Sequence, residues 1–227
     1  MTSLTPPDYE AIYLSTKVAL AATALSLPFG IGFAYVMSFT AFRGKLLLEV
    51  LINLPLTLPP VVIGYLLLLV LGKNGWIGSF LDQLGIRIIF TWKAAVIASA
   101  VVGFPLLVRA VRLSMEHIDY QLIQASRTLG ASRHDTFLTI ILPLSLPGVV
   151  AGSLLMFARS LGEFGATIIV AGNIPGVTQT IPLAIYDYAS SPASEAMAIS
   201  LCVISILMSA VVLLLHEFIS IKLAKRG

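Results

Sequence analysis

The chain has 227 residues, of which 58% are hydrophobic and only 11% are charged, and its mean hydropathy is +0.97. A typical soluble domain carries about 25% charged residues, so a soluble domain of this composition would leave too much apolar surface in water. A polytopic membrane protein is the interpretation that fits. The formal net charge of +3 gives little support to nucleic-acid binding, and a single cysteine, Cys202, excludes a disulfide within the chain.

Five segments are long and apolar enough to cross a membrane, and helices are required because lipid offers the backbone no hydrogen bonds. Asp8 and Glu10 precede the first segment and no basic region does, so we predict a retained span rather than a cleaved signal peptide. The sequence therefore predicts an all-α polytopic membrane protein with five transmembrane helices in one domain, residues 1–227. The segments cover about residues 18–39, 46–71, 94–108 with an extension to 91–92, 144 to beyond 157, and 197–215.

The second segment contains a proline-rich stretch, residues 53–60, with prolines at positions 55, 59 and 60. Proline removes a backbone donor and clashes with the preceding turn, so this segment cannot be one straight helix. One interpretation is a kinked span that neighbouring helices tolerate, and another is irregular backbone that lines a water-filled path. Both can hold together. The polar residues of this stretch, Asn53 and Thr57, are therefore candidates for a pathway.

The distribution of Lys and Arg predicts the orientation of the chain in the membrane. With the N-terminus outside, nine basic residues fall on inner segments and four on outer segments. Because basic residues accumulate on the cytoplasmic side, we expect the N-terminus out and the C-terminus in. The inner residues are Arg43, Lys45, Arg109, Arg112, Arg127, Arg133, Lys222, Lys225 and Arg226, and the outer ones are Lys17, Lys73, Arg87 and Lys93.

A polar segment, residues 119–143, interrupts the apolar sequence between the third and fourth predicted spans. Asp119 is placed to cap a helix over residues 120–129, and Gly130 to end it in a left-handed conformation. Ser132 begins a second helix, with Asp135 in a capping-box-like position. Pro143 is expected to close this second helix where the fourth span begins. The predicted orientation places the segment in the cytoplasm.

The spacing within this segment resembles the coupling motif of bacterial ABC-importer permeases, which reads Glu-Ala-Ala, three residues, Gly, nine residues, Ile-x-Leu-Pro. The resemblance implies a cytoplasmic coupling region over about residues 110–143 that inserts into a cleft of an ATP-hydrolysing subunit. A mere cytoplasmic loop with capped helices would not explain the distant Ile-x-Leu-Pro. Here Gln124 replaces the Glu, which removes a charge, and Ser126 replaces the second Ala. The matching positions are Gln124, Ala125, Ser126, Gly130, Ile140, Leu142 and Pro143.

The chain lacks a phosphate-binding loop of the form GxxxxGK[ST], so the energy must come from another polypeptide or from an ion gradient. Its histidines, His117, His134 and His216, are scattered without the spacing of a zinc site, and no catalytic triad is indicated. We therefore expect neither an enzyme nor a cofactor. Five spans enclose little volume, and a homodimer is the simplest way to complete a pathway.

A second block, residues 157–167, resembles molybdate importer permeases, together with residues 172–176, 180–182, 41–45 and 54–65. Sulfate and tungstate permeases share parts of its Arg-x-x-Gly-Glu-Phe-Gly pattern. The resemblance implies import of molybdate across the bacterial cytoplasmic (inner) membrane by a homodimer with two cytoplasmic ATP-binding subunits and an extracytoplasmic substrate-binding protein. The alternatives are a sulfate or tungstate permease, a gradient-driven secondary transporter, and a membrane scaffold that does not transport.

Arg159 and Glu163 are spaced to pair along one face of the fourth span. At about 1.5 Å per residue from position 144, they lie roughly 22 Å and 28 Å along it, toward the outer side. One interpretation is a structural ion pair, and another is a contribution to the outer closure of the pathway, because ionisable groups at membrane depth usually face the bundle interior. The candidate pathway or gate residues are Asn53, Thr57, Arg159, Ser160, Glu163 and Thr167.

Overall fold

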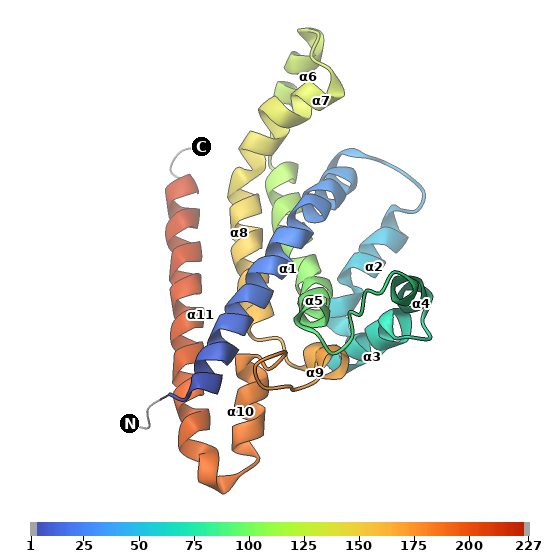
Figure 1. The fold of residues 1–227 in the computed structure, drawn as a ribbon. Coiled ribbons are helices and arrows are strands. Elements are labelled where there is room, and N and C mark those ends of the chain that lie inside the picture. Colours follow the sequence, from blue (N-terminus) through green and yellow to red (C-terminus); the bar gives the residue numbers. More distant parts are fainter. Residues whose placement is uncertain (1–3, 225–227) are drawn as a thin grey trace.

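The computed structural model describes residues 4–224, and every regular element within that range is a helix (Figure 1), which confirms the predicted all-α class. Two of the residues used to predict orientation, Lys225 and Arg226, lie outside the described residues. The elements are α1 (Pro6–Phe39), α2 (Lys45–Thr57), α3 (Pro60–Leu71), α4 (Trp76–Gln83), α5 (Trp92–Glu116), α6 (Tyr120–Thr128), α7 (Arg133–Thr136), a π turn (Phe137–Ile141), α8 (Leu142–Leu161), α9 (Gly165–Ala171), α10 (Ile181–Ala189), a 3₁₀ turn (Pro192–Ser194) and α11 (Glu195–Ala224).

Within residues 4–224, four helices are long and apolar enough to cross a membrane, and a bent pair raises the number to five if it is counted as one span. The first helix begins twelve residues earlier than the apolar window indicates, at Pro6 rather than position 18. The four helices are Pro6–Phe39, Trp92–Glu116, Arg133–Leu161 and Pro192–Lys222, and the bent pair is Lys45–Thr57 with Pro60–Leu71.

The second apolar segment is broken, as its prolines predict. Helices α2 and α3 meet at a bend of 115° at Leu58 and Pro59. Since α2 has 13 residues, it rises only about 20 Å, which is less than a hydrocarbon core of about 30 Å. Helix α3 packs on α9, where a Cβ at Gly64 would lie 2.8 Å from the carbonyl oxygen of Ala166. Helix α3 has 12 residues, so neither half is long enough to cross alone and a crossing by this segment needs both helices.

Helices α1 and α5 run in the same direction. Near the start of both, the ammonium of Lys17 lies 4.1 Å from the ring centroid of Trp92. Near their ends, Tyr35 and Phe39 of α1 line the same cavity as Met115 of α5. Both helices thus begin at one end of the molecule and finish at the other, next to α6 and α7 (Figure 1).

Helix α8 packs against α5 in the opposite direction through very small residues. Gly148 and Gly152 form a Gly-x-x-x-Gly pattern, which lets two helix backbones approach closely in a membrane. A Cβ at Gly148 would lie 2.3 Å from the Cβ of Ser114 and 2.6 Å from the carbonyl oxygen of Ala110. The backbone of α8 therefore lies directly against that of α5. The sequence patterns described above do not predict this contact.

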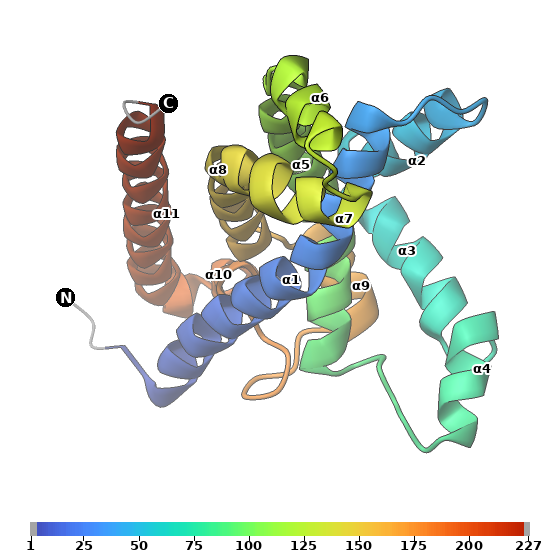
Figure 2. The same cartoon turned by 90° about the horizontal axis from the view of Figure 1, so that it is seen from above.

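Helix α10 lies at the end of the molecule opposite to α6, next to the start of α1 (Figure 1). Near the start of α1, Asp8 accepts a hydrogen bond from the Tyr188 hydroxyl (2.9 Å), and Ser15 Oγ accepts one from the Ile181 N–H (2.7 Å). Helix α10 is thereby attached to α1. From there α11 runs back to the end that carries α6 and α7, and both views separate it from α2 to α4 (Figures 1 and 2).

Replacing Gly148 tests the α5–α8 contact. Gly148→Leu must separate the two helices, because the new side chain meets backbone and Cβ atoms that cannot rotate away, at a cost of about 3 kcal/mol or more. We expect a large fall in the thermal unfolding temperature of the purified protein. Gly32→Leu is the matched control, since no atom lies within 4 Å of a Cβ there. Equal effects of the two substitutions would contradict the assigned contact.

Candidate functional site

The polar segment turns sharply at Gly130, which has a φ of +90°. The Gly130 N–H donates to the Arg127 carbonyl and the Ala131 N–H donates to the Ser126 carbonyl, both at 3.0 Å. These two bonds form a Schellman motif, the left-handed helix end that glycine favours. The predicted stop of the first short helix at Gly130 is confirmed. No other atom would touch a Cβ there, so only the backbone conformation demands glycine.

The predicted caps on both sides of this corner are also confirmed. Asp119 Oδ1 accepts from the Gln121 N–H at 2.9 Å at the start of α6. At the start of α7, Ser132 Oγ accepts from the Asp135 N–H, and Asp135 Oδ2 accepts from the Ser132 N–H, each at 3.1 Å. Local capping therefore defines where both helices begin.

The prediction that Pro143 closes the second short helix is wrong. One helix of 29 residues continues from Arg133 to Leu161, through the proline. A proline inside a helix lacks its N–H and crowds the carbonyl four residues before it. Here the helix widens into a π turn just ahead of Pro143, where the Leu142 N–H donates to the Phe137 carbonyl five residues back. The wider turn lets the chain pass the proline without ending the helix.

Ser126 makes a contact between the two short helices. Its hydroxyl lies 3.0 Å from the hydroxyl of Thr136, which is only 1% exposed and also donates to the Ser132 carbonyl at 2.9 Å. A position where the coupling motif has alanine thus carries an interhelical contact here. The Gly130 corner is therefore stabilised by the buried Ser126–Thr136 contact as well as by its backbone hydrogen bonds.

The outer surface of the corner is open to a partner. Gln124, Ala125 and Gly130 are exposed, Ile140 and Leu142 are half-buried, and Pro143 is exposed. Leu129 projects from the tip with 88% of its surface exposed.

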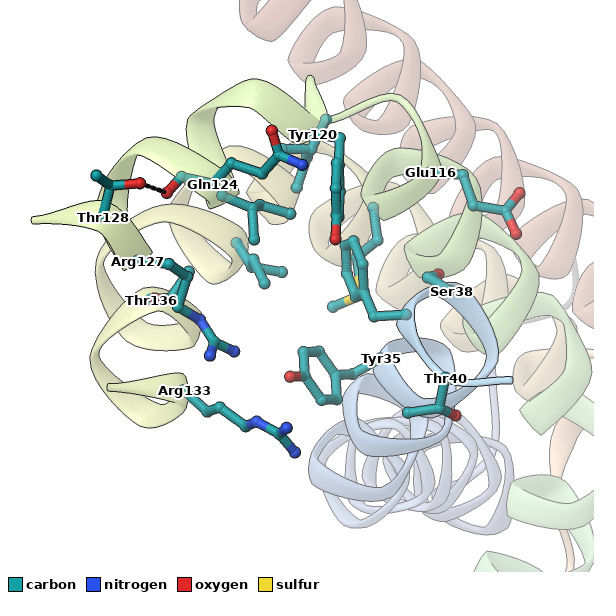
Figure 3. A pocket seen from close by; sticks show the side chains of 15 residues that line it. Tyr35, Ser38, Thr40, Glu116, Tyr120, Gln124, Arg127, Thr128, Arg133 and Thr136 are labelled. Atoms are coloured by element: carbon teal, nitrogen blue, oxygen red, sulfur yellow. Dashed lines mark hydrogen bonds between the residues drawn. The ribbon is translucent and has the colours of Figure 1, made fainter. Parts of the chain in front are cut away.

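A cleft of about 900 Å³ lies between this corner and the ends of α1 and α5 (Figure 3). The guanidinium groups of Arg127 and Arg133 and the hydroxyl of Tyr35 point into it. The ring of Tyr35 packs edge-on against Phe137 at a centroid distance of 5.2 Å. The cleft is therefore in direct contact with the π turn of the long helix.

Asn53, a predicted pathway residue, belongs to a polar network between α2 and α5. Its Oδ1 accepts from Arg109 Nε at 2.6 Å, and its Nδ2 donates to the Glu49 carbonyl at 2.7 Å. Arg112 forms ion pairs with Glu49 at 2.8 Å and with Glu116 at 2.6 Å. The sequence analysis missed this network, because the partners in α2 and α5 are 56 and 63 residues apart. Only the four-residue spacing of Arg112 and Glu116 signals part of it.

The predicted Arg159–Glu163 pair forms, with 2.8 Å between Nη1 and Oε2. Its geometry differs from the expected one, because α8 ends at Leu161 and Glu163 lies beyond that end rather than on a helix face. The Glu163 side chain, 2% exposed, also accepts from the Ala166 N–H at 2.9 Å, whereas Arg159 is 32% exposed. Glu163 therefore connects the end of α8 to the start of α9.

The six predicted pathway residues thus fall into separate places. Ser160 on α8 and Thr167 on α9 are both buried, and in the sequence they lie close to Arg159 and Glu163. Thr57 is exposed at the end of α2. Asn53 lies in the α2–α5 network. Among residues 4–224, no group of three or more His, Cys, Asp or Glu side chains is arranged to hold a metal ion.

Comparison with known proteins gives consistent results. A family model described as "Binding-protein-dependent transport system inner membrane component" matches residues 26–225. The molybdenum transport system permease protein ModB of Escherichia coli K12 is 52% identical over 218 residues, 96% of this chain and 95% of that protein. ModB of Haemophilus influenzae is 53% identical over 220 residues, 96% of each chain. The crystal structure of a bacterial alginate ABC importer superposes with a TM-score of 0.75, at 14% identity, over 96% of this chain and 80% of that one.

A double-substitution experiment tests the Arg159–Glu163 pair. Arg159→Ala leaves the buried carboxylate of Glu163 without its cation, which we expect to cost roughly 3 kcal/mol. Arg159→Ala/Glu163→Gln removes the charge but keeps an oxygen for the Ala166 N–H, so it should be more stable than Arg159→Ala alone. Thermal unfolding of Arg159→Ala, Glu163→Gln and the double variant measures the difference. If the free-energy changes of the two single substitutions add up to that of the double substitution, the two side chains do not stabilise each other.

Proposed function

The chain belongs to the family of binding-protein-dependent transport system inner membrane components, and on that premise we propose that it is the permease subunit of a molybdate ABC importer. Two copies form the pathway, and ATP is hydrolysed by a separate subunit. The observation that carries the proposal is the capped Gly130 corner at the end of one unbroken helix, Arg133–Leu161. This arrangement joins a partner-binding surface to the opposite end of the molecule.

The continuous helix supplies a route for coupling. Its 29 residues span about 43 Å, so a displacement of the corner by the ATPase is carried to the Arg159–Glu163 pair. Helix α5 moves with it, because Gly148 and Gly152 seat α8 directly on the α5 backbone. Glu163 then passes the movement to α9 and, through the Gly64 contact, to α3. The bent α2–α3 pair thus responds to ATPase closure.

We propose five spans with the N-terminus outside and the C-terminus inside. Because α1 and α5 are parallel, the chain must cross again between Phe39 and Trp92. The bent α2–α3 pair is the apolar segment available for that crossing. The start of α1 lies opposite to α6 and the end of α11 lies on the same side as α6, which supports the orientation (Figure 1).

We propose a homodimer with two cytoplasmic ATP-binding subunits and an extracytoplasmic binding protein, in the bacterial cytoplasmic membrane. The unpartnered surface of α2 supports a second copy, because none of the residues of α2 is buried. Its apolar side chains Leu46, Leu47 and Leu51 are 74%, 65% and 55% exposed. The solved alginate transporter structures include one in complex with a periplasmic protein, which supports the same class of partner here.

Molybdate is the proposed substrate because the relatives at 52% and 53% identity are named for molybdenum transport. Along the proposed pathway, Arg109 contacts the amide of Asn53, and within residues 4–224 it forms no ion pair with a carboxylate. A cation without a carboxylate partner favours passage of an oxyanion. Sulfate and tungstate share this chemistry, so uptake of the three anions by reconstituted vesicles is the direct comparison.

The corner at Gly130 gives a test of coupling. Gly130→Val places a β-branched residue at φ +90°, at a cost on the order of 1–3 kcal/mol in a surface turn. We expect the variant to insert and dimerise but to retain little ATPase subunit and show little substrate-stimulated ATP hydrolysis. Copurification and ATPase assays in nanodiscs measure both effects.

Gly130→Asn is the matched control, because asparagine tolerates the left-handed conformation and should preserve most of the coupling. Normal binding and coupling by Gly130→Val would show that the corner is not the docking element. Loss of the variant from the membrane would show that the polar segment is needed for folding instead.

The orientation is tested by cysteine labelling in a Cys202→Ser background. A cysteine at the N-terminus should react with an impermeant reagent in intact cells. Cysteines at Arg43 and Lys225 should react only after permeabilisation, because both lie on the proposed inner face. The opposite labelling pattern would reverse the proposed arrangement.

A further inference from the structure

The cleft beside the Gly130 corner contains two positive charges without a negative partner in the described part of the chain. Arg127, in the last turn of α6, and Arg133, at the start of α7, both point toward the Tyr35 hydroxyl (Figure 3). The ion pairs formed within residues 4–224 involve Arg87, Arg112 and Arg159 instead. Three side chains that can donate hydrogen bonds therefore face one space.

The nearby carboxylates have other hydrogen-bond or ion-pair partners within the described residues. Asp119 accepts from the Gln121 N–H, and Asp135 accepts from both the N–H and the hydroxyl of Ser132. Glu116 lines the far wall of the cleft and is paired with Arg112 at 2.6 Å. Gln124, which also lines the cleft, is neutral at the position where the coupling motif has a glutamate. Within residues 4–224, therefore, no carboxylate forms an ion pair with Arg127 or Arg133 in the cleft.

We propose that this cleft receives an acidic segment of the ATP-hydrolysing subunit, whose carboxylates bind Arg127 and Arg133; this rests on the proposed function. Arginine presents a planar fork of donors that matches a carboxylate in two hydrogen bonds. Two walls of the cleft are α6 and α7 themselves, so a partner that contacts the corner also reaches the cleft. A volume of about 900 Å³ admits several side chains.

The cleft lies at the start of the long helix, so a partner bound there acts directly on that helix. Tyr35 faces the two arginines and packs on Phe137 of the π turn. Arg133 is the first residue of the long helix that ends at Leu161. A carboxylate bound here therefore holds the partner directly on the element that carries movement across the permease, in addition to the exposed surface around Leu129.

The test compares ATPase binding at several ionic strengths. The dimeric chain in nanodiscs is titrated with the ATPase subunit that copurifies with it. Arg127→Gln/Arg133→Gln should weaken binding at low ionic strength by about tenfold or more and flatten the salt dependence. Arg127→Lys/Arg133→Lys, which keeps both charges, should retain most of the affinity and the salt dependence.

Arg43→Gln/Lys45→Gln is the matched control. It removes one charge from the α1–α2 connection and one from the first residue of α2, a region that both views show apart from α6, and it should bind as the wild-type chain does (Figures 1 and 2). If the wild-type chain binds no ATPase at any ionic strength, the proposed function itself fails. If the wild-type chain and Arg127→Gln/Arg133→Gln bind equally with the same salt dependence, the acidic contact is overturned. It is also overturned if the variant binds ATPase normally but loses bound anionic phospholipid in native mass spectrometry, which would identify a lipid phosphate site.

Discussion

Helices α5 and α8 approach so closely at Gly148 and Gly152 that no side chain separates them, and the rest of the structure depends on this contact. In lipid there is no hydrophobic force between two apolar helices, so close packing of small residues has to hold them together. The contact fixes the direction of α8 against α5, and α5 against α1 through the Lys17–Trp92 and Phe33–Phe104 contacts. These three helices form the frame that carries the polar segment at one end and α9 at the other.

Polar groups are concentrated where the frame changes direction. The Schellman motif at Gly130 and the two caps beside it satisfy backbone groups at this corner. At the opposite end, Glu163 bridges the end of α8 and the start of α9. The Arg112–Glu49 ion pair connects α5 to α2. Because unsatisfied polar groups are costly in lipid, each of these sites satisfies its polar groups by joining two elements.

Two predictions about helix ends were wrong for the same reason. Pro143 was expected to stop a helix, and Arg159 and Glu163 were expected to share one. Proline preferences and residue spacing describe an ideal α-helix. The structure departs from that ideal with a π turn before Pro143 and a break after Leu161. Packing of Phe137 on Tyr35 and the buried position of Glu163 accompany these departures, and both involve contacts between distant parts of the chain.

The sequence by itself determined the helical class, the apolar segments, the broken second segment and the capped corner at Gly130, because these follow from composition and from interactions within a few residues. Only the tertiary structure decided that one helix runs from Arg133 to Leu161, that Asn53 binds Arg109, and that Arg127 and Arg133 face Tyr35 across a cleft. The physical reason is distance along the chain. The contacts Asn53–Arg109 and Tyr35–Phe137 join residues 56 and 102 positions apart, and they depend on how the helices pack, which local sequence patterns do not reveal.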